Sequence, residues 1–256
     1  YSADDIALSP QGKVLDVAER LDTLAGGFAA GLKPTGNKDP FALRRNALGL
    51  ARTIIESGEE LSLYQLLLEA SKYVIASMHT VTHRELDAAL TAAKERGVAA
   101  QVATKASWIP IEQNVADSLY DFILDRLRGY YAERGVPATH FNAVAELQPA
   151  SLYDFARRID AIGQFAALPE AEALAAANKR IGNILRKVEG EIPDAIDAAA
   201  LVEPAEERLA EVLQGVEAAA DAALAQRNYV TALKHLAQLR EPIDAFFEGV
   251  MVMAED

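Results

Sequence analysis

The sequence predicts an all-α protein, a multi-helix bundle, and three observations lead to that prediction. Apolar residues make up 51% of the 256 residues, enough to build a core and unlike a disordered chain. Alanine and leucine recur with a period of about 3.6 residues, and no stretch alternates as a half-buried strand would. Glycine, proline and capping residues separate the apolar stretches at the distances that helices require.

The helices of the first half are delimited by their end signals. An apolar stripe begins at residue 11 and is followed by Gly26 and Gly27, so the helix is expected to end there or shortly after. Asp39 is expected to cap the second helix, with Pro40 in its first turn. The pattern is weaker after residue 70. The predicted helices cover 11–25, 40–56, a stretch from 61, and 83–96.

The helical pattern is sharper from residue 111 onward. Five apolar residues at spacings of four and three form one stripe: Val115, Leu119, Ile123, Leu127 and Tyr130. Ser151 and Asp154 resemble a capping box, and Asn228 and Pro242 mark the starts of the last two helices. The earlier predicted helices of this half cover 112–133, 139–147 (capped by Thr139), 151–166, 169–188 and 205–225.

Composition and charge exclude several classes of protein. The 25 basic and 38 acidic residues give a net charge of −13, which excludes a globally basic nucleic-acid binder. The absence of cysteine excludes disulfides, thiolate metal ligands and a cysteine nucleophile. No apolar stretch is long enough to span a membrane, so no membrane partner is expected. The chain lacks an initiator methionine and a signal-peptide pattern at its start, so it is expected to be a fragment of a longer protein.

The charge is unevenly distributed. Residues 189–256 contain 15 acidic and 4 basic residues, whereas residues 20–52 contain six basic and two acidic ones, a net of +4. A polyanion is therefore expected to approach the first two thirds of the chain. Lys38, Arg44 and Arg45 are the candidates for contacts with an RNA backbone. The alternative is that Arg44 or Arg45 pairs with Asp22 or Asp39 inside the domain.

No catalytic or metal site is expected. His79 and His83 are four residues apart, but no glutamate lies between them and no third ligand is evident, so a solvated or core pair is the better interpretation. Asp121 and Asp125 lie beside arginines, which favours ordinary surface ion pairing.

The predicted helix over 169–188 has two different faces. Its apolar face carries Leu174, Ile181 and Leu185. The opposite face carries Lys179, Asn183 and Lys187, without the acidic partners that usually alternate with such cations. A solvated surface is the default interpretation of such a face. The alternative is that the lysines bind phosphates while Asn183 reads a base edge. Arg180 lies on the rim, where it can contact a neighbouring helix.

Several long segments resemble one family. They are RLDTL at 20–24, GLKPTGNKDPFALRR at 31–45, DFILDRLRGYY at 121–131, AAANKRIGNILRK at 175–187 and LREPIDAFFEGVMVM at 239–253. Together they resemble the C-terminal part of the beta subunit of bacterial glycyl-tRNA synthetase, over nearly the whole chain and in the same order. The resemblance implies the end of an HD-like helical domain at 1–58, a helical linker region at 59–110, and a DALR-type anticodon-binding helical bundle at 111–256 that is truncated at its C-terminus.

The resemblance also implies a function. In this family a separate alpha subunit holds the glycine and ATP site, and the beta subunit recognises tRNA. The expected partners are therefore tRNA(Gly) and the alpha subunit, in a cytoplasmic heterotetramer. ATP and Mg are expected to act in the alpha subunit, and no cofactor in this fragment. The residues expected to contact tRNA are Lys38, Arg44, Arg45, Arg126, Arg128, Lys179, Arg180, Asn183 and Lys187. Arg126 or Arg128 is expected to help the 169–188 helix hold the anticodon, and Arg126, which flanks the apolar stripe, is the more structural of the two.

Two other functions stay open at this point. A helical scaffold would bind the alpha subunit without touching RNA. An HD-type phosphohydrolase would need the His-Asp pair that names that domain, which the sequence does not contain. Glu19 stands before Arg20-Leu21-Asp22, a further departure from the pattern of that fold.

Overall fold

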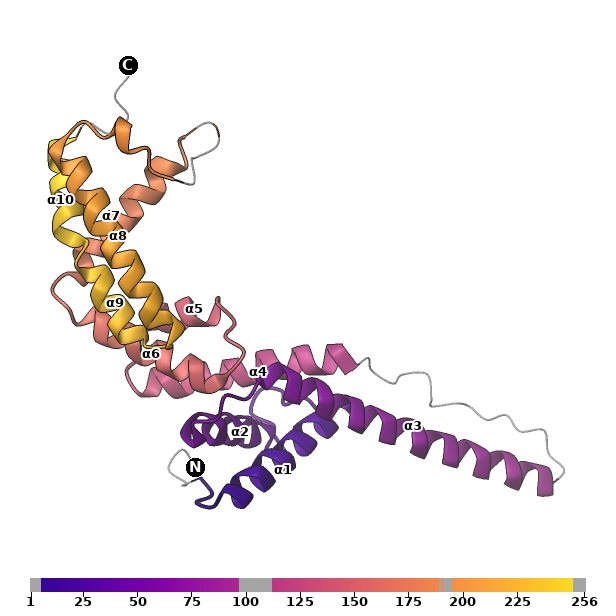
Figure 1. The fold of residues 1–256 in the computed structure, drawn as a ribbon. Coiled ribbons are helices and arrows are strands. Elements are labelled where there is room, and N and C mark those ends of the chain that lie inside the picture. The colour runs from indigo at the N-terminus through magenta and orange to yellow at the C-terminus, as the bar shows by residue number, and fades with distance from the viewer. Residues whose placement is uncertain (1–5, 97–111, 189, 191–194, 251–256) are drawn as a thin grey trace. The chain divides into compact units, whose positions relative to one another are not determined.

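The computed structural model describes residues 6–96, 112–188, 190 and 195–250, and within these ranges the chain is helical, without any strand longer than an isolated bridge (Figure 1). The prediction of an all-α fold is confirmed. The chain forms two compact units, residues 1–156 and residues 157–256, named here unit 1 and unit 2. The division between the units falls within one helix. The domain boundaries expected from the sequence, after residues 58 and 110, lie elsewhere and stay a prediction.

Unit 1 is built from the first five helices and the start of the sixth. The helices are α1 (Pro10–Ala29), α2 (Leu43–Ser57), α3 (Leu63–Glu95), α4 (Glu112–Glu133), α5 (Ala138–Ala145) and α6 (Leu152–Ala166). Four residues of the predicted stripe of α4 are buried, and of these Leu119, Ile123 and Leu127 are fully inaccessible to solvent, whereas Tyr130 is half-buried. Helix α4 packs against α1, α2 and α3, so its apolar face completes the core that these three helices begin.

Helix α1 ends at Ala29, shortly after Gly26 and Gly27, as expected from the sequence. A Cβ at Gly27 would lie 3.0 Å from a methyl carbon of Leu43, so glycine here allows α2 to approach α1. Two other predicted details of unit 1 are wrong. Helix α3 is one helix of 33 residues, because no glycine or proline interrupts it and the β-branched residues near Val81 cost only tenths of a kcal/mol each. Helix α5 begins at Ala138 with Pro137 at its N-cap, so Thr139 lies inside the first turn and does not cap it.

Both Ser151 and Asp39 cap helices as predicted, but the helix that Asp39 caps begins later than expected. Ser151 accepts hydrogen bonds from the backbone N–H groups of Tyr153 and Asp154, as a cap of α6 should. Asp39 also caps the second helix, but from further away than predicted. Its carboxylate accepts from the N–H groups of Leu43 and Arg44 at 2.8 and 2.9 Å, while Ala42 takes a left-handed conformation with φ 53°. The helix therefore begins at Leu43 rather than at Pro40.

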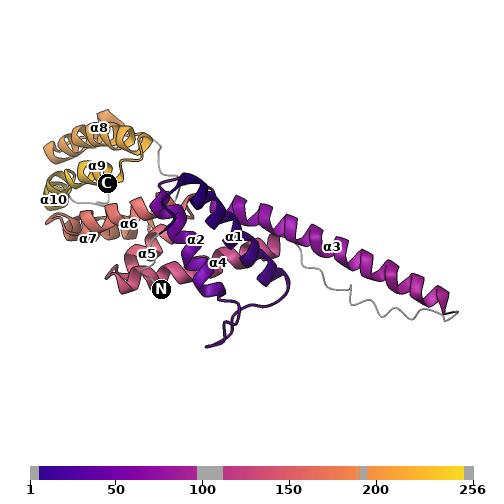
Figure 2. The ribbon, with the colours of Figure 1, turned by 90° about the horizontal axis from the view of Figure 1, so that it is seen from below.

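Helix α3 extends beyond the other helices of unit 1. Ile75 is the last buried side chain along it, and the described side chains that follow are exposed or half-buried. Figures 1 and 2 show the second half of α3 running away from α1, α2 and α4. The core of unit 1 therefore lies around the first half of α3 only.

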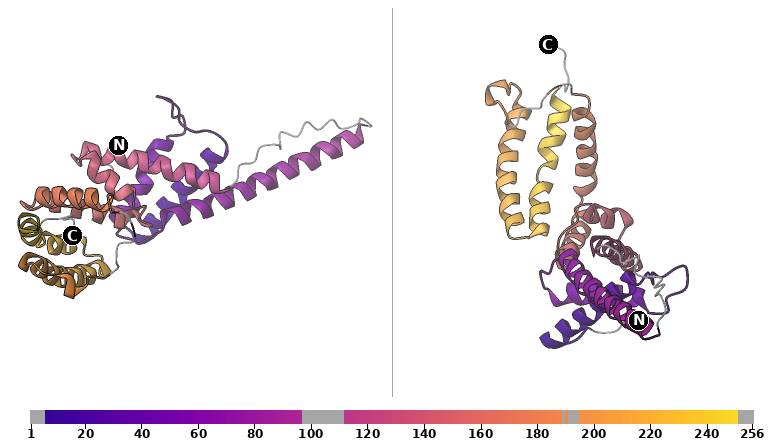
Figure 3. Two further views of the ribbon diagram at one scale, coloured as in Figure 1. Left: turned by 90° about the horizontal axis from the view of Figure 1, so that it is seen from above. Right: turned by 90° about the vertical axis from the view of Figure 1, so that its right-hand side faces the viewer.

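Unit 2 contains the rest of α6 and the helices that follow. They are α7 (Ala171–Leu185), the short 3₁₀ helix η2 (Ala198–Ala200), α8 (Pro204–Ala225), α9 (Tyr229–Ala237) and α10 (Arg240–Gly249). Helix α8 packs against α9 and α10, and α10 also contacts α7, so that α9 and α10 lie between α8 and α7 (Figure 3, right). Asn228 caps α9 as predicted, accepting from the N–H of Thr231. The predicted helix 169–188 is shorter than expected, since α7 ends at Leu185.

Candidate nucleic-acid interface

The loop between α1 and α2 is held in place by Arg44. Thr35 and Lys38 pair through both backbone groups around Gly36, which has φ 51°. The guanidinium of Arg44 donates to the carbonyl oxygen of Gly36 at 2.7 Å and to that of Lys38 at 3.5 Å. Arg44 therefore does not pair with Asp39 through its side chain, as one interpretation of the sequence had it. The Lys38 side chain is exposed at the edge of this loop.

Arg126 and Arg128 lie on α4 and differ in their surroundings. Arg126 pairs with the adjacent Asp125 and lies over the ring of Phe122, 5.7 Å from its centroid. Its Nε–H is buried and has no hydrogen-bond partner. Arg128 donates to the side-chain oxygen of Asn142 and lies 4.7 Å from the centroid of Phe141. The charge of Arg126 is thus compensated by a carboxylate, while that of Arg128 is bonded to a neutral amide.

A cleft of about 910 Å³ lies between α1, α2 and α4, within unit 1. Six arginines and four acidic residues line it, so its lining has a net charge of +2 in a chain of net charge −13. The arginines are Arg20, Arg44, Arg45, Arg52, Arg126 and Arg128. The acidic residues are Asp16, Asp39, Asp125 and Glu133. The cleft therefore joins the basic segment at 44–45 with the arginines of α4, two groups that lie some eighty residues apart in the sequence.

One wall of this cleft contains a hydrogen-bonded network that links α1 to α2. Arg20 donates to Asp16 at 2.8 Å and to Asn46 at 3.1 Å, and Thr53 donates to Asp16 at 2.7 Å. Burial acts to raise the pKa of Asp16, but the hydrogen bonds from Arg20 and Thr53 outweigh it, and the pKa lies below its ordinary value. A Cβ at Gly49 would come within 2.3 Å of the Arg20 guanidinium, so the arginine passes directly over this glycine. The charges of Arg20 and Asp16 therefore compensate each other within the fold.

The polar face of α7 is exposed, as predicted. Lys179, Arg180 and Asn183 are all exposed, and Lys187 follows the last turn of the helix. Arg180 contacts a neighbouring helix, since its guanidinium lies 3.7 Å from the ring centroid of Phe247 on α10. Asn183 accepts a hydrogen bond from Arg186 at 2.6 Å, which occupies its side-chain oxygen and leaves its amide N–H groups to donate.

Comparison with known proteins decides the family. The family model described as "Glycyl-tRNA synthetase beta subunit" matches residues 1–146, more than half of the chain. The chain belongs to the glycyl-tRNA synthetase beta subunit family. A second model, "DALR anticodon binding domain", matches residues 174–256, a range that includes most of α7 and all of α8 to α10.

Curated relatives extend this assignment to the whole chain. Proteins named glycine–tRNA ligase beta subunit are 60% identical in Xanthomonas campestris pv. campestris (strain 8004), 56% in Xylella fastidiosa (strain M12) and 41% in Janthinobacterium sp. (strain Marseille). Each match includes all of this chain but only 33%, 35% and 32% of the respective relative. This family member thus spans about a third of the length of the curated relatives it matches.

The nine predicted contact residues of this family member fall into two groups. Arg44, Arg45, Arg126 and Arg128 line the cleft of unit 1, with Lys38 on the loop that Arg44 holds. The other four lie on or just after α7 in unit 2: Lys179, Arg180, Asn183 and Lys187. That Arg126 and Arg128 share a cleft with α2 could not be predicted from the sequence, because their proximity depends on how α4 packs.

Sequence reasoning also missed a pair of arginines on α6. Arg158 donates to the hydroxyl of Tyr229 at 3.0 Å and lies 4.4 Å from the centroid of its ring. Arg157 lies 5.8 Å from the same centroid and donates to the carbonyl oxygen of Arg227. Two adjacent arginines in a helix do not by themselves predict this contact, since their partners are about seventy residues away in the sequence.

Two features are absent from the described residues. They contain no group of three or more His, Asp or Glu side chains placed to hold a metal ion. His79 and His83 both lie on the exposed part of α3. None of the helices described is both long and apolar enough to cross a membrane.

Proposed function

We propose that this chain is a tRNA-recognition part of a glycine–tRNA ligase beta subunit, and that α7 contacts the anticodon of tRNA(Gly). The observation that carries the proposal is the coincidence of the anticodon-binding match at 174–256 with an exposed cationic helix face in an otherwise acidic unit. Aminoacylation itself, with ATP and Mg, is assigned in this proposal to the alpha subunit, and the reaction to the cytoplasm.

The charges of unit 2 favour one direction of approach. Residues 157–188 contain six basic and three acidic residues, whereas residues 195–250 contain four basic and ten acidic ones. The acidic helix α8 would repel phosphates, and the polar face of α7 would attract them. Lys179 and Lys187 suit phosphates as flexible point charges. Asn183 has its amide N–H groups available and is the candidate for contact with a base.

Titration of labelled tRNAs at several salt concentrations tests this proposal. A tRNA binder loses affinity steeply as salt rises, because phosphate contacts release counterions. Lys179→Ala should weaken all tRNAs by a similar factor. Asn183→Ala should mainly reduce the preference for the glycine anticodon, by about 1–3 kcal/mol if the contact resembles base readout in DNA.

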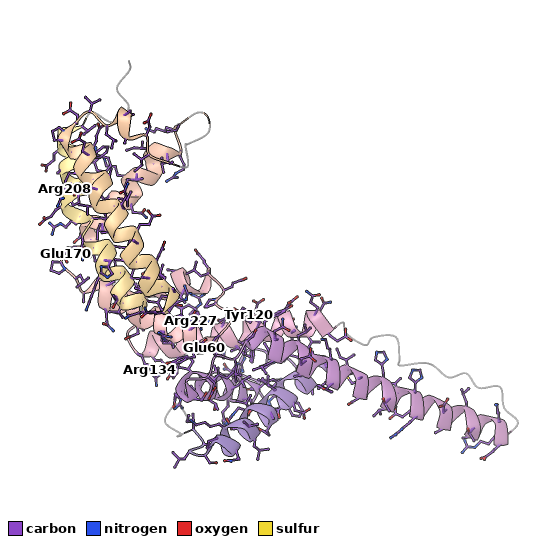
Figure 4. The ribbon with its side chains drawn as sticks, viewed as in Figure 1. Glu60, Tyr120, Arg134, Glu170, Arg208 and Arg227 are labelled. Atoms are coloured by element: carbon purple, nitrogen blue, oxygen red, sulfur yellow. The ribbon has the colours of Figure 1, made fainter. Side chains whose placement is uncertain are left out.

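The matched control is Arg208→Ala. Arg208 is labelled in Figure 4 and is an exposed residue of α8 that pairs with Glu211. Its removal should leave tRNA binding unchanged. If Lys179→Ala and Asn183→Ala also leave affinity and selectivity unchanged in a folded chain, the assignment of α7 is wrong. A chain that binds the alpha subunit and no tRNA would instead be an assembly scaffold.

A further inference from the structure

We infer that the cleft between α1, α2 and α4 is a second RNA contact, which binds phosphates of the sugar–phosphate backbone, and that Asp125 competes with RNA for Arg126. The inference rests on the proposed function, because it assumes that the ligand is tRNA. It places a contact in unit 1 that is separate from the anticodon contact proposed for unit 2.

Among the described residues, no carboxylate pairs with the side chain of Arg44 or Arg128. The side-chain hydrogen bonds of Arg44 go to the carbonyl oxygens of Gly36 and Lys38, and that of Arg128 goes to the amide of Asn142. These acceptors are neutral, so both guanidinium groups keep their full charge. An anion in the cleft can therefore be attracted without breaking an existing ion pair.

Two of the four acidic residues that line the cleft accept hydrogen bonds within the fold. Asp16 accepts from Arg20 and Thr53, and Asp39 accepts from two backbone N–H groups at the start of α2. Their negative charges are stabilised where they stand and oppose an incoming phosphate less than unpaired carboxylates would. Asp125 and Glu133 are the acidic lining residues whose charges oppose it most directly.

Asp125 and Arg126 form an ion pair at the cleft. Asp125 bonds one terminal nitrogen of Arg126, whose Nε–H stays buried without a partner, so the pair lacks the two-point geometry that makes arginine pairs strong. The side chain of Asp125 is 59% exposed, and an exposed pair of this kind contributes little stability. A phosphate can therefore replace Asp125 at low cost, which makes Asp125 a competitor for the site.

The arrangement of donors in the cleft favours one class of ligand. A small phosphate ester is usually held by several backbone N–H groups at a helix N-terminus, but at the start of α2 the N–H groups of Leu43 and Arg44 are taken by Asp39. The cleft instead offers guanidinium groups spread over about 910 Å³. That arrangement suits a long polyanion with a charge on every residue, such as the RNA backbone, better than a single small anion.

Two substitutions in opposite directions test the inference with a labelled tRNA(Gly) transcript and the 256-residue chain. Asp125→Asn removes the competitor and should tighten binding a few-fold, on the scale of an exposed ion pair. Arg128→Gln removes a charge and should weaken binding several-fold and lower the salt slope by about one. Arg128→Lys keeps the charge and should retain most of the affinity. Melting curves followed by circular dichroism establish that each variant is folded.

Three controls separate the possible outcomes. Arg208→Gln, outside the cleft, should change nothing. If Asp125→Asn and Arg128→Gln leave binding and salt slope unchanged while Lys179→Ala weakens binding, the cleft is only solvated surface and the proposed function stands. If the chain does not bind tRNA at all, the proposed function is wrong, and the inference that rests on it is wrong with it. If millimolar inorganic phosphate displaces tRNA from the native chain but not from Arg128→Gln, the cleft is a small-anion site and the inference is wrong.

Discussion

The two units of this chain are stabilised in different ways. Among the described residues, all of the largest fully buried side chains lie in unit 1, including Leu50, Ile123 and Phe141. The buried residues of unit 2 are mostly alanines, and no residue of α10 is buried. Unit 2 relies instead on partly exposed contacts between arginines and aromatic rings, such as Arg158 on Tyr229 and Arg180 on Phe247.

The two proposed contacts therefore lie on units that differ in stability and stiffness. Burial of apolar side chains contributes about 25 cal/mol per Å², so unit 1 has the larger reserve of stability. The cleft of unit 1 is expected to be preformed. Helix α7, with only Ala171 buried, is expected to adjust when it binds, and a bound ligand should then stabilise unit 2 by mass action.

The largest expected effect contrasts the two cores directly. Ile123→Ala removes a fully buried side chain of α4 and should lower the free energy of unfolding by about 2–5 kcal/mol. Ile181→Ala removes a half-buried side chain of α7 and should cost only about 1 kcal/mol, because less area returns to water. Urea unfolding, with hydrogen exchange read separately on peptides of each unit, measures both. Equal losses would show that the cores do not differ as described.

A smaller effect concerns alkaline pH and is confined to unit 1. Burial among aromatic rings raises the pKa of Tyr131 to about 12, and its ring lies 6.1 Å from those of Phe141 and Phe155. A raised pKa gives stability that is complete below the unfolded value of about 10 and is lost as pH rises through the folded value. The loss between those values should be on the order of 2 kcal/mol.

The measurement for Tyr131 is urea unfolding at pH 8 and near pH 12. Tyr131→Phe keeps the ring but cannot ionise, so it should lose less stability than the native chain over the same interval. If both lose the same amount, other tyrosines or lysines cause the alkaline loss.

The smallest effect compares two glycines, one in each unit. Gly215→Ala on α8 meets no atom within 4 Å, so it should stabilise unit 2 by about 0.5–1 kcal/mol through helix propensity. Gly49→Ala on α2 gains the same propensity but displaces Arg20 from Asp16 and Asn46. Its net change should be near zero or unfavourable. Thermal melting of the two variants side by side checks this, and an equal gain at both positions would contradict the network described for Arg20.

Local features of the fold could be predicted from the sequence because they depend on neighbouring residues. The buried stripe of α4, the Ser151 cap and the Asn228 cap each follow from residues within one or two turns. The start of α2 could not be predicted, because Pro40 and Asp39 suit a helix start while the chain inserts a turn with Ala42 at φ 53°. The left-handed conformation of Ala42 is rare for alanine and cannot be predicted from the amino-acid composition.

The candidate site was predicted residue by residue but not as an arrangement. Arg44, Arg45, Arg126 and Arg128 were each predicted from the sequence, and the packing of α4 on α2 places all four in one cleft. The role of Arg44 in holding its loop was not foreseen, because its acceptors are backbone carbonyl groups, which every residue has. Whether these residues contact tRNA stays a prediction.

The attachment of Tyr229 to α6 has a consequence for the order in which unit 2 folds. Its hydrogen bonds join residues that are 70 and 71 positions apart, from Arg157 to Arg227 and from Arg158 to Tyr229. Closing a loop of that length lowers the conformational entropy of the chain before any favourable contact forms, and contacts between distant residues slow folding. Helices α8 and α9, which are adjacent in the chain, can form their hairpin first. The attachment to α6 should then be the late step, and the first to open when the chain begins to unfold.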